Sequence, residues 1–411
     1  MSQSAAVTAG KAAGREAAGD AKQLPKAVGE NLTKMGMGLA VVGVAAAGAG
    51  YAMDAKRFAF SYLIGFLYVA TIALGGLCFV QIQHLVKAGW SVVARRQAEW
   101  AAGIMPGVAI LFAPVIAFSH TIYHHWMGEE AAHDPILQHK AGYLNPNFFY
   151  ARAALYLVLW VGLALFFTRT SRQQDESGDK KLSEKMTAAA APATMLFALS
   201  VTFAGFDWVM SLNPHWYSTI FGVYIFAGCM TSFLSVLALM TVRLQENGYF
   251  VKLSTIEHRH DIGKLLFGFV VFFAYIGFSQ FILIWYADLP EETVFYHDRW
   301  DADSWKVVSL AIPILHFAVP FLLLLSRHVK RHPVGLSVGA ILMLVMHYVD
   351  LYWLVMPTYD HHHATFGVVD ICGLLGPLGI GAFLLARQAA AGPLYPLRDP
   401  WLGETVKVDN P

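Results

Sequence analysis

The sequence has 411 residues, of which 56% are hydrophobic and only 14% are charged, against the roughly 25% charged residues usual in soluble domains. So few charged residues cannot cover a globular protein of this size with a solvated surface, whereas a surface that faces lipid needs none. The formal net charge of +1 argues against nucleic acid or a polyanionic substrate as a partner.

Ten segments are apolar and long enough to cross a membrane, since a bilayer core requires about 20 apolar residues of helix. The first, rich in Gly and Ala behind a basic stretch, also resembles a signal peptide, but the roughly 34 residues before it would make a long leader, and we expect a retained helix. The sequence predicts an all-α, polytopic membrane protein with a cytoplasmic N-terminal segment (1–34), a transmembrane domain (35–390) and a cytoplasmic C-terminal tail (391–411). The ten segments run approximately over 35–53, 58–84, 100–122, 148–168, 186–211, 217–242, 263–287, 306–326, 333–356 and 365–387.

The Lys and Arg residues are divided unevenly between the two sides of these helices. The N-terminal segment and the stretches after helices 2, 4, 6, 8 and 10 carry 23 of the 29, and the other side carries six. Because cytoplasmic loops are enriched in Lys and Arg, both termini are predicted to be cytoplasmic. The stretch 169–185 is expected to be a solvated cytoplasmic loop, and helices 2–5 and 6–9 are candidates for two four-helix bundles.

Several ionisable side chains fall inside the predicted helices, where a charge costs on the order of 3 kcal/mol on insertion scales. Asp207 lies one turn from the outer end of helix 5. His347 and Asp350 share a face of helix 9 because they are three residues apart. His316 is near the middle of helix 8. Three further candidates are Tyr275 and Asp288 on helix 7 and Asp370 at the start of helix 10.

Acids, imidazoles and hydroxyls that reach inward from neighbouring helices are what a proton path requires. Each transfer needs groups a few ångströms apart or bridged by water, and some must titrate near neutral pH. The alternative for Asp207 and Asp350 is helix capping or hydrogen bonding to nearby backbone, and for His316 it is a core histidine with satisfied bonds. The spread of these groups over helices 5, 7, 9 and 10 favours a path over separate structural roles.

Ligands for redox cofactors and metals are sparse. No CxxCH or CxxC motif occurs, which argues against covalent haem c and cysteine-ligated iron–sulfur clusters on this chain. Only His316 and His347 lie deep enough to ligate haem b, at different depths. For the five histidines of the outer loop 120–147 we favour a partner-facing loop over a Zn or Cu site. Aromatic residues at helix ends, such as Trp208, are assigned to the interfacial belt, with stacking on a quinone head group as the alternative.

Three stretches resemble one family of respiratory membrane subunits. They are FDWVMSLNPHWYSTIFGVY (206–224), FILIWYADLPEETVFYHDRW (281–300) and HYVDLYWLVMPTY (347–359). They are similar to the shorter NrfD-like integral subunit of bacterial alternative complex III, often called ActF, and the resemblance covers about residues 55–390. The residues of this sequence that match the family motifs are Asp207, His215, Asp288, Glu291, Glu292, His347 and Asp350.

The resemblance implies two four-helix bundles flanked by helices 1 and 10, in a bacterial inner (cytoplasmic) membrane. It implies a quinol oxidoreductase complex that passes electrons to a cytochrome c or directly to a terminal oxidase. The expected partners, besides membrane lipids, are a longer NrfD-like subunit that holds the quinol site, an iron–sulfur subunit and multihaem cytochrome c subunits. Haems c and iron–sulfur clusters would reside on those partners. This chain would carry no cofactor, with a quinone as one candidate ligand, and would not be catalytic alone.

We consider four functions. The first is a proton-translocating subunit without redox centres, in which Asp207, His347 and Asp350 form the outer part of the path and His316 and Tyr275 extend it to mid-membrane. The cytoplasmic half looks drier, with Thr231, Ser232 and Ser235 on helix 6. The motif residue Glu291 is a further candidate at the outer surface.

The second function is a quinone-binding subunit that uses His347, Asp350 and Trp208. The third is a secondary transporter, which requires helices broken at corresponding positions of two halves. Pro106 and Pro114 in helix 3 and the Gly376–Pro377 pair in helix 10 do not meet that requirement. The fourth is a purely structural anchor with inert polar networks.

Overall fold

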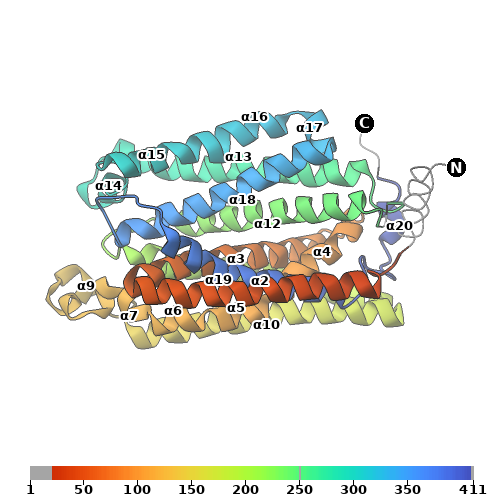
Figure 1. Ribbon diagram of the computed structural model, residues 1–411, viewed down its shortest axis with the longest axis horizontal. Coiled ribbons are helices and arrows are strands. Elements are labelled where there is room, and N and C mark those ends of the chain that lie inside the picture. Colours follow the sequence, from red (N-terminus) through yellow and green to blue (C-terminus); the bar gives the residue numbers. More distant parts are fainter. Residues whose placement is uncertain (1–20, 250, 409–411) are drawn as a thin grey trace.

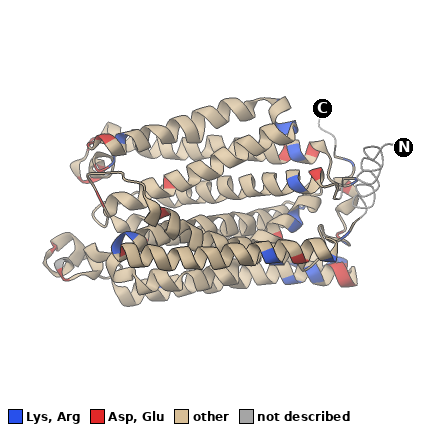
Figure 2. Ribbon diagram, viewed as in Figure 1, with Lys and Arg blue, Asp and Glu red and all other residues tan. Residues whose placement is uncertain are grey.

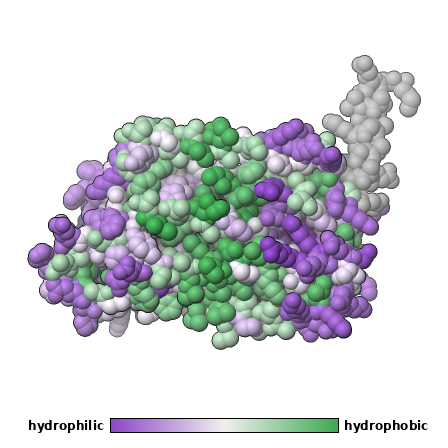
Figure 3. Space-filling model, turned by 90° about the horizontal axis from the view of Figure 1, so that it is seen from below, coloured by the Kyte–Doolittle hydropathy of each residue, from purple (hydrophilic) through white to green (hydrophobic). Residues whose placement is uncertain are grey.

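The computed structural model of the protein describes residues 21–249 and 251–408. Within this part of the chain, ten helical stretches are long and apolar enough to cross a membrane, which confirms the predicted all-α membrane fold. On the face shown in Figure 3, hydrophobic residues form a band across the middle of the molecule and hydrophilic residues gather at both ends.

Six of the ten spans are single helices, and the other four are broken or extended by short helical pieces. The single helices are α2 (Lys26–Met53), α3 (Ala55–Leu85), α10 (Pro146–Ser177), α12 (Phe221–Glu246), α13 (Ile256–Ala287) and α19 (Val368–Ala390). The composite spans are α4–α5–α6 (Val92–Ala102, Met105–Leu111, Ala113–Ala117), α11–η2 (Lys180–Trp208, Met210–Leu212), α15–η3–α16 (Asp303–Ala311, Ile312–Ala318, Val319–Leu325) and α18–η4 (Pro333–Val355, Met356–Thr358).

The remaining short helices lie at the two ends of the bundle (Figure 1). We call the end that holds α7–α9 and α14 the distal end, and the opposite end, where α20 and the start of α2 lie, the terminal end. Lys and Arg residues gather mainly toward the terminal end (Figure 2). These short elements are α7 (Ser119–Ile122), α8 (His124–Met127), η1 (Glu129–His133), α9 (Pro135–Lys140), α14 (Pro290–His297), α17 (Arg327–Arg331) and α20 (Leu402–Thr405).

Local sequence signals set many of the helix boundaries. Asp54 and Asn145 accept hydrogen bonds from backbone N–H groups in the first turns of α3 and α10, because the first N–H groups of a helix have no intrahelical partner. Gly178 ends α10 in the left-handed conformation, which glycine adopts without steric cost. Pro106 and Pro114 stand in the first turns of α5 and α6, so they divide the third span into pieces.

The spans form two four-helix bundles with two flanking helices. Bundle 1 contains α3, α4–α6, α10 and α11, and bundle 2 contains α12, α13, α15–α16 and α18. The two bundles meet where α3 and α11 pack against α12 and where α18 packs against α3. The flanking helices α2 and α19 pack tightly on each other, and α19 packs on α3. This close approach needs glycine: a Cβ at Gly43 would collide with the carbonyl oxygen of Leu375.

The structure corrects three details of the sequence analysis. The stretch 169–185 is mostly helical, because α10 continues to Ser177 and α11 begins at Lys180. The first span begins at Lys26 rather than near residue 35, so the predicted boundary of the N-terminal segment lies inside α2. The third span begins at Val92 rather than near residue 100, and it therefore includes the charged stretch that was assigned to a loop. Most of the predicted segment 1–34 lies outside the described residues.

Candidate functional site

The buried acid Asp350 lies inside bundle 2, about one and a half turns before the distal end of α18. Its carboxylate accepts a hydrogen bond from the hydroxyl of Tyr224 on α12. Asp350 is 2% exposed and Tyr224 is 5% exposed. The partner is a neutral group, so this contact does not balance a carboxylate charge. An acid in that position is costly to keep in a membrane helix, which makes it the first candidate for function.

Two histidines lie deeper in the same interior. Nε2 of His347 is 2.8 Å from the hydroxyl of Thr71 on α3, and its Nδ1 has no hydrogen-bond partner among the described residues. His316 is fully buried in η3, a π-helical turn that packs against α18. Both of its ring nitrogens lack a partner within the same described region. Buried polar groups are normally satisfied, and π-helical turns are frequent at functional sites.

The two histidines and Asp350 form one neighbourhood, which we call the interior cluster: Thr71, Tyr224, His316, His347 and Asp350. His347 is within electrostatic range of His316. His347 and Asp350 share a face of α18 as predicted, but their hydrogen-bond partners are on different helices. His347 is paired with Thr71 on α3, and Asp350 with Tyr224 on α12. The ring of His347 can approach α12 because residue 228 is glycine: a Cβ there would lie 3.2 Å from Cε1 of His347.

Asp207 belongs to a separate site in bundle 1. Arg152 on α10 donates two hydrogen bonds to its carboxylate, at 2.7 and 2.9 Å, and Tyr156 donates a third at 2.9 Å. The guanidinium also lies 3.8 Å from the ring centre of Tyr143. Asp207 is therefore held in a buried ion pair that joins α10 to α11, and the structure does not bring it together with the interior cluster.

Asp370 is also paired. It accepts hydrogen bonds from Arg57 and from the hydroxyl of Ser61 at 2.7 Å, and its carboxylate accepts from the backbone N–H of Gly367 at the start of α19. Asp370 thus has the capping role that the sequence analysis considered as the alternative for Asp207 and Asp350. It joins α19 to α3.

The other predicted residues lie on the surface. Tyr275 is 64% exposed on the outer face of α13, so it points away from His316. Asp288 is exposed and ends α13 in the left-handed conformation with φ 49°. Glu291 and Glu292 are in the first turn of α14, where acidic residues favour the positive end of the helix dipole.

A polar network that the sequence analysis missed fills the terminal end of bundle 1. Arg95 pairs with Asp399 of the C-terminal tail, and Arg96 pairs with Glu99 at 2.7 Å. Glu99 accepts a further hydrogen bond from Ser171 on α10 at 2.8 Å. Further buried polar residues in this part of the molecule are Gln81, His84, Gln97 and Thr241, of which the last two hydrogen-bond at 2.9 Å.

Between this network and the interior cluster, hydroxyl groups line α12. Thr231, Ser232 and Ser235 are fully buried, and each donates to a carbonyl of its own helix. This stretch is therefore less polar than the network on one side of it and the interior cluster on the other.

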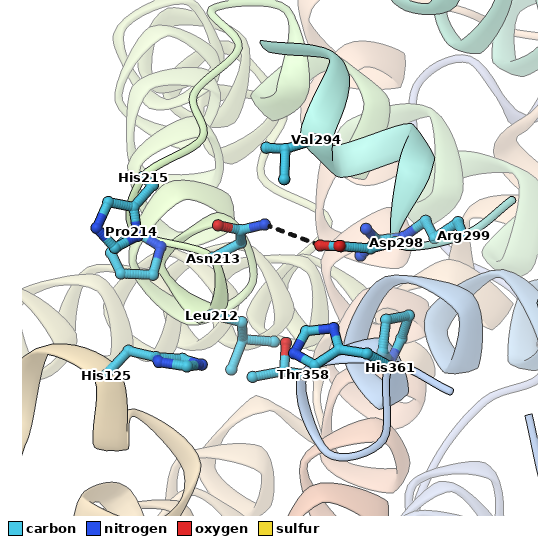
Figure 4. A pocket seen from close by; sticks show the side chains of 11 residues that line it. His125, Leu212, Asn213, Pro214, His215, Val294, Asp298, Arg299, Thr358 and His361 are labelled. Carbon is cyan, nitrogen blue, oxygen red and sulfur yellow. Dashed lines mark hydrogen bonds between the residues drawn. The ribbon is translucent and has the colours of Figure 1, made fainter. Parts of the chain in front are cut away.

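A cavity of about 210 Å³ opens at the distal end, and we call it the distal cavity (Figure 4). Three segments that are far apart in the sequence meet there, and they belong to the three motif stretches: 212–215, 294–299 and 357–358. His125 and His361 complete the wall. Burial, with the neighbouring His124 and His361, lowers the pKa of His125 to about 4. Burial raises the pKa of Asp298, which accepts a long hydrogen bond (3.5 Å) from Asn213.

The described residues contain no group of three or more His, Cys, Asp or Glu side chains that could hold a metal ion. Asp134 of the outer loop pairs with His215, which follows η2, at 2.5 Å. That hydrogen bond lowers the pKa of Asp134. Trp208 is buried against Phe112, with ring centres 4.7 Å apart, so its ring is part of the packed core of bundle 1.

The sequence alone identified four candidates, because each is an acid or a histidine inside a predicted membrane helix: Asp207, His316, His347 and Asp350. Their partners could not be found in the same way, because contacts between helices distant in sequence have no local signal. The network around Glu99 had a signal, the sequence RRQAE within an apolar region. It was overlooked because the third span was started after it.

Comparison with models of protein families gave no match, and comparison with curated proteins gave no significant similarity.

Proposed function

We propose that this chain is an integral membrane subunit of a quinol-oxidising respiratory complex, an alternative complex III, to which it contributes a proton path and scaffolding but no redox centre. The observation that carries the proton path is Asp350, a 2% exposed carboxylate in a membrane helix whose partner is the neutral hydroxyl of Tyr224. Such a group is expensive to retain in a membrane unless it does something that an apolar residue cannot do.

The proposed path begins at the terminal end of bundle 1 and continues through bundle 2 toward the distal end. The polar groups along the path are, in order, the network around Glu99 and Gln97 at the terminal end, His347 and His316, Asp350, and the lining of the distal cavity. The hydroxyls on α12 are bonded to their own helix, so water has to bridge the middle step. In this proposal the distal end faces the outside and both termini face the cytoplasm, which agrees with the gathering of Lys and Arg at the terminal end (Figure 2).

Membership of the complex is supported by the resemblance of the three motif stretches, which are not scattered but converge on the distal cavity. It is tested by purification of the native complex through a tag on this chain after mild detergent extraction. We expect haem c absorbance, an iron–sulfur signal in electron paramagnetic resonance, and quinol oxidation in the same fraction. Isolation of the chain without haem and without iron–sulfur signal would contradict the proposal and would reopen the transporter alternative.

The variant His347→Gln separates a proton path from a quinone site. For a path, quinol oxidation in reconstituted vesicles continues while fewer protons are moved per electron, because glutamine cannot relay a proton as imidazole does. For a quinone site, co-purified quinone is lost and the KM for quinol rises. The matched control is His363→Gln, since His363 lies on an exposed distal loop with a side chain that is 72% exposed.

A further inference from the structure

Two adjoining cavities at the distal end are both lined by one buried side chain, Arg299. The first is the distal cavity, which contains His125, His361 and Asp298 (Figure 4). The second is much smaller, about 10 Å³, and reaches Phe221 at the start of α12. Both are lined by Arg299, and they share Leu212, Asn213 and Thr358 as well.

The guanidinium of Arg299 is held firmly at this junction. Its Nε and Nη2 donate to the carbonyl oxygens of Trp353 and Leu354 at 3.0 and 3.1 Å, and Nη1 donates to that of Phe295 at 2.7 Å. It also lies 3.6 Å from the centre of the Phe295 ring. The residue is 3% exposed. All three acceptors are neutral, so these contacts fix the cation without cancelling its charge.

The small cavity leads toward the interior cluster. Phe221, which lines it, stacks on Tyr224 with ring centres 6.2 Å apart. Tyr224 donates to Asp350. Contacts therefore connect the cavities to the buried acid: Arg299 and Phe221 line the small cavity, Phe221 stacks on Tyr224, and Tyr224 donates to Asp350. The guanidinium of Arg299 is at the junction of the two cavities and within electrostatic range of Tyr224.

We propose that Arg299 is an electrostatic barrier that keeps protons of the distal cavity from returning to Asp350. A cation repels a hydronium ion strongly in a low-dielectric surrounding, and fixed arginines exclude protons and cations from other membrane pores in this way. The proposal rests on the proposed proton path and adds to it a barrier that slows passive proton leak through the distal end. Burial lowers the pKa of Arg299 to about 9, so the guanidinium stays charged at neutral pH.

The test measures passive proton entry into vesicles that contain the purified complex and an internal pH-sensitive dye. The membrane potential is clamped with potassium and valinomycin, and the distal side receives an acid pulse. We expect Arg299→Gln to raise the rate of proton entry about tenfold or more, and Arg299→Lys, which keeps the charge, to stay near the wild-type rate. The double variant Arg299→Gln with Asp350→Asn should return to the wild-type rate, because the leak passes through Asp350.

A second pair of variants leaves the hydrogen bonds of Arg299 in place. Thr358 lines both cavities and is partly exposed, so Thr358→Asp brings a neutralising charge to the junction. This variant should leak, whereas its isosteric control Thr358→Asn should not.

Several results overturn the barrier. They are an Arg299→Gln complex as tight as wild type, a leak of equal size in Arg299→Lys, a leak that persists in the double variant, and equal rates for the two Thr358 variants. Failure of the proton path itself is recognised separately: Asp350→Asn alone would then leave the protons moved per electron unchanged.

Discussion

Replacing Asp207 with Asn should destabilise the protein far more than the same replacement at Asp350. The side chains of Asp207 and Arg152 are 0% and 8% exposed, and loss of one partner of a buried ion pair costs about 3–5 kcal/mol. Arg152 keeps the Tyr143 carbonyl and lies over two aromatic rings, which recover part of the loss. We expect a net cost near the lower limit, about 3 kcal/mol. Asp350→Asn exchanges one hydrogen bond of a carboxylate for one of an amide, at a cost of about 1 kcal/mol or less.

The assay is the thermal midpoint of each variant in the same detergent and at the same scan rate, because unfolding of membrane complexes is commonly irreversible. The double variant Arg152→Gln with Asp207→Asn should lose less in thermal midpoint than the two single variants lose together, since it no longer leaves a buried charge without a partner. The reasoning is refuted if Asp350→Asn lowers the midpoint as much as Asp207→Asn, because Asp350 would then be a structural acid.

Two further predictions concern packing and pH. Gly75→Ala should cost about 1–3 kcal/mol, because its Cβ would collide with the Cys229 carbonyl and separate α3 from α12. The control Gly38→Ala, whose Cβ meets nothing within 4 Å, should be tolerated. Equal yields of monodisperse protein from the two variants would contradict this expectation. Between pH 6.5 and 4 the unfolded chain binds a proton at His125 that the folded chain does not, since burial lowers the folded pKa to about 4. The free energy of unfolding should therefore decrease as the pH is lowered from 6.5 to 4, by about 1–2 kcal/mol after allowance for the partial exposure of His125. His125→Gln should flatten the change in thermal midpoint between pH 7.5 and 5.0, and an unaltered slope would show that His125 does not cause it.

Hydropathy was sufficient to find all ten spans because the cost of placing polar backbone and charge in a bilayer acts on each segment by itself. It was less accurate at the terminal end, where helices continue beyond the apolar stretch. The charged sequence 169–185 was assigned to a loop, although only Gly178 and Asp179 interrupt the helices there. Charge marks where a helix leaves the bilayer and does not mark where the helix ends.

The site was predictable for the residues whose position alone is unusual. His347 and Asp350 are polar groups three residues apart in an apolar helix, and the structure places both in the interior cluster. Asp207 had the same local signal, but its role depends on Arg152, which is 55 residues away in the sequence. Similarly, nothing in the local sequence marks Arg299, a loop residue that the fold places in the wall of two cavities. Tertiary packing decides which buried charges are matched and which are not.

The most direct test of the proton path is the number of protons moved per electron by vesicles that contain the complex with Asp350→Asn. The control is Asp288→Asn, an exposed aspartate in a left-handed conformation that asparagine also adopts readily. The account predicts that quinol oxidation continues in both variants and that only Asp350→Asn moves fewer protons per electron. An unchanged ratio in Asp350→Asn would contradict the path through the interior cluster.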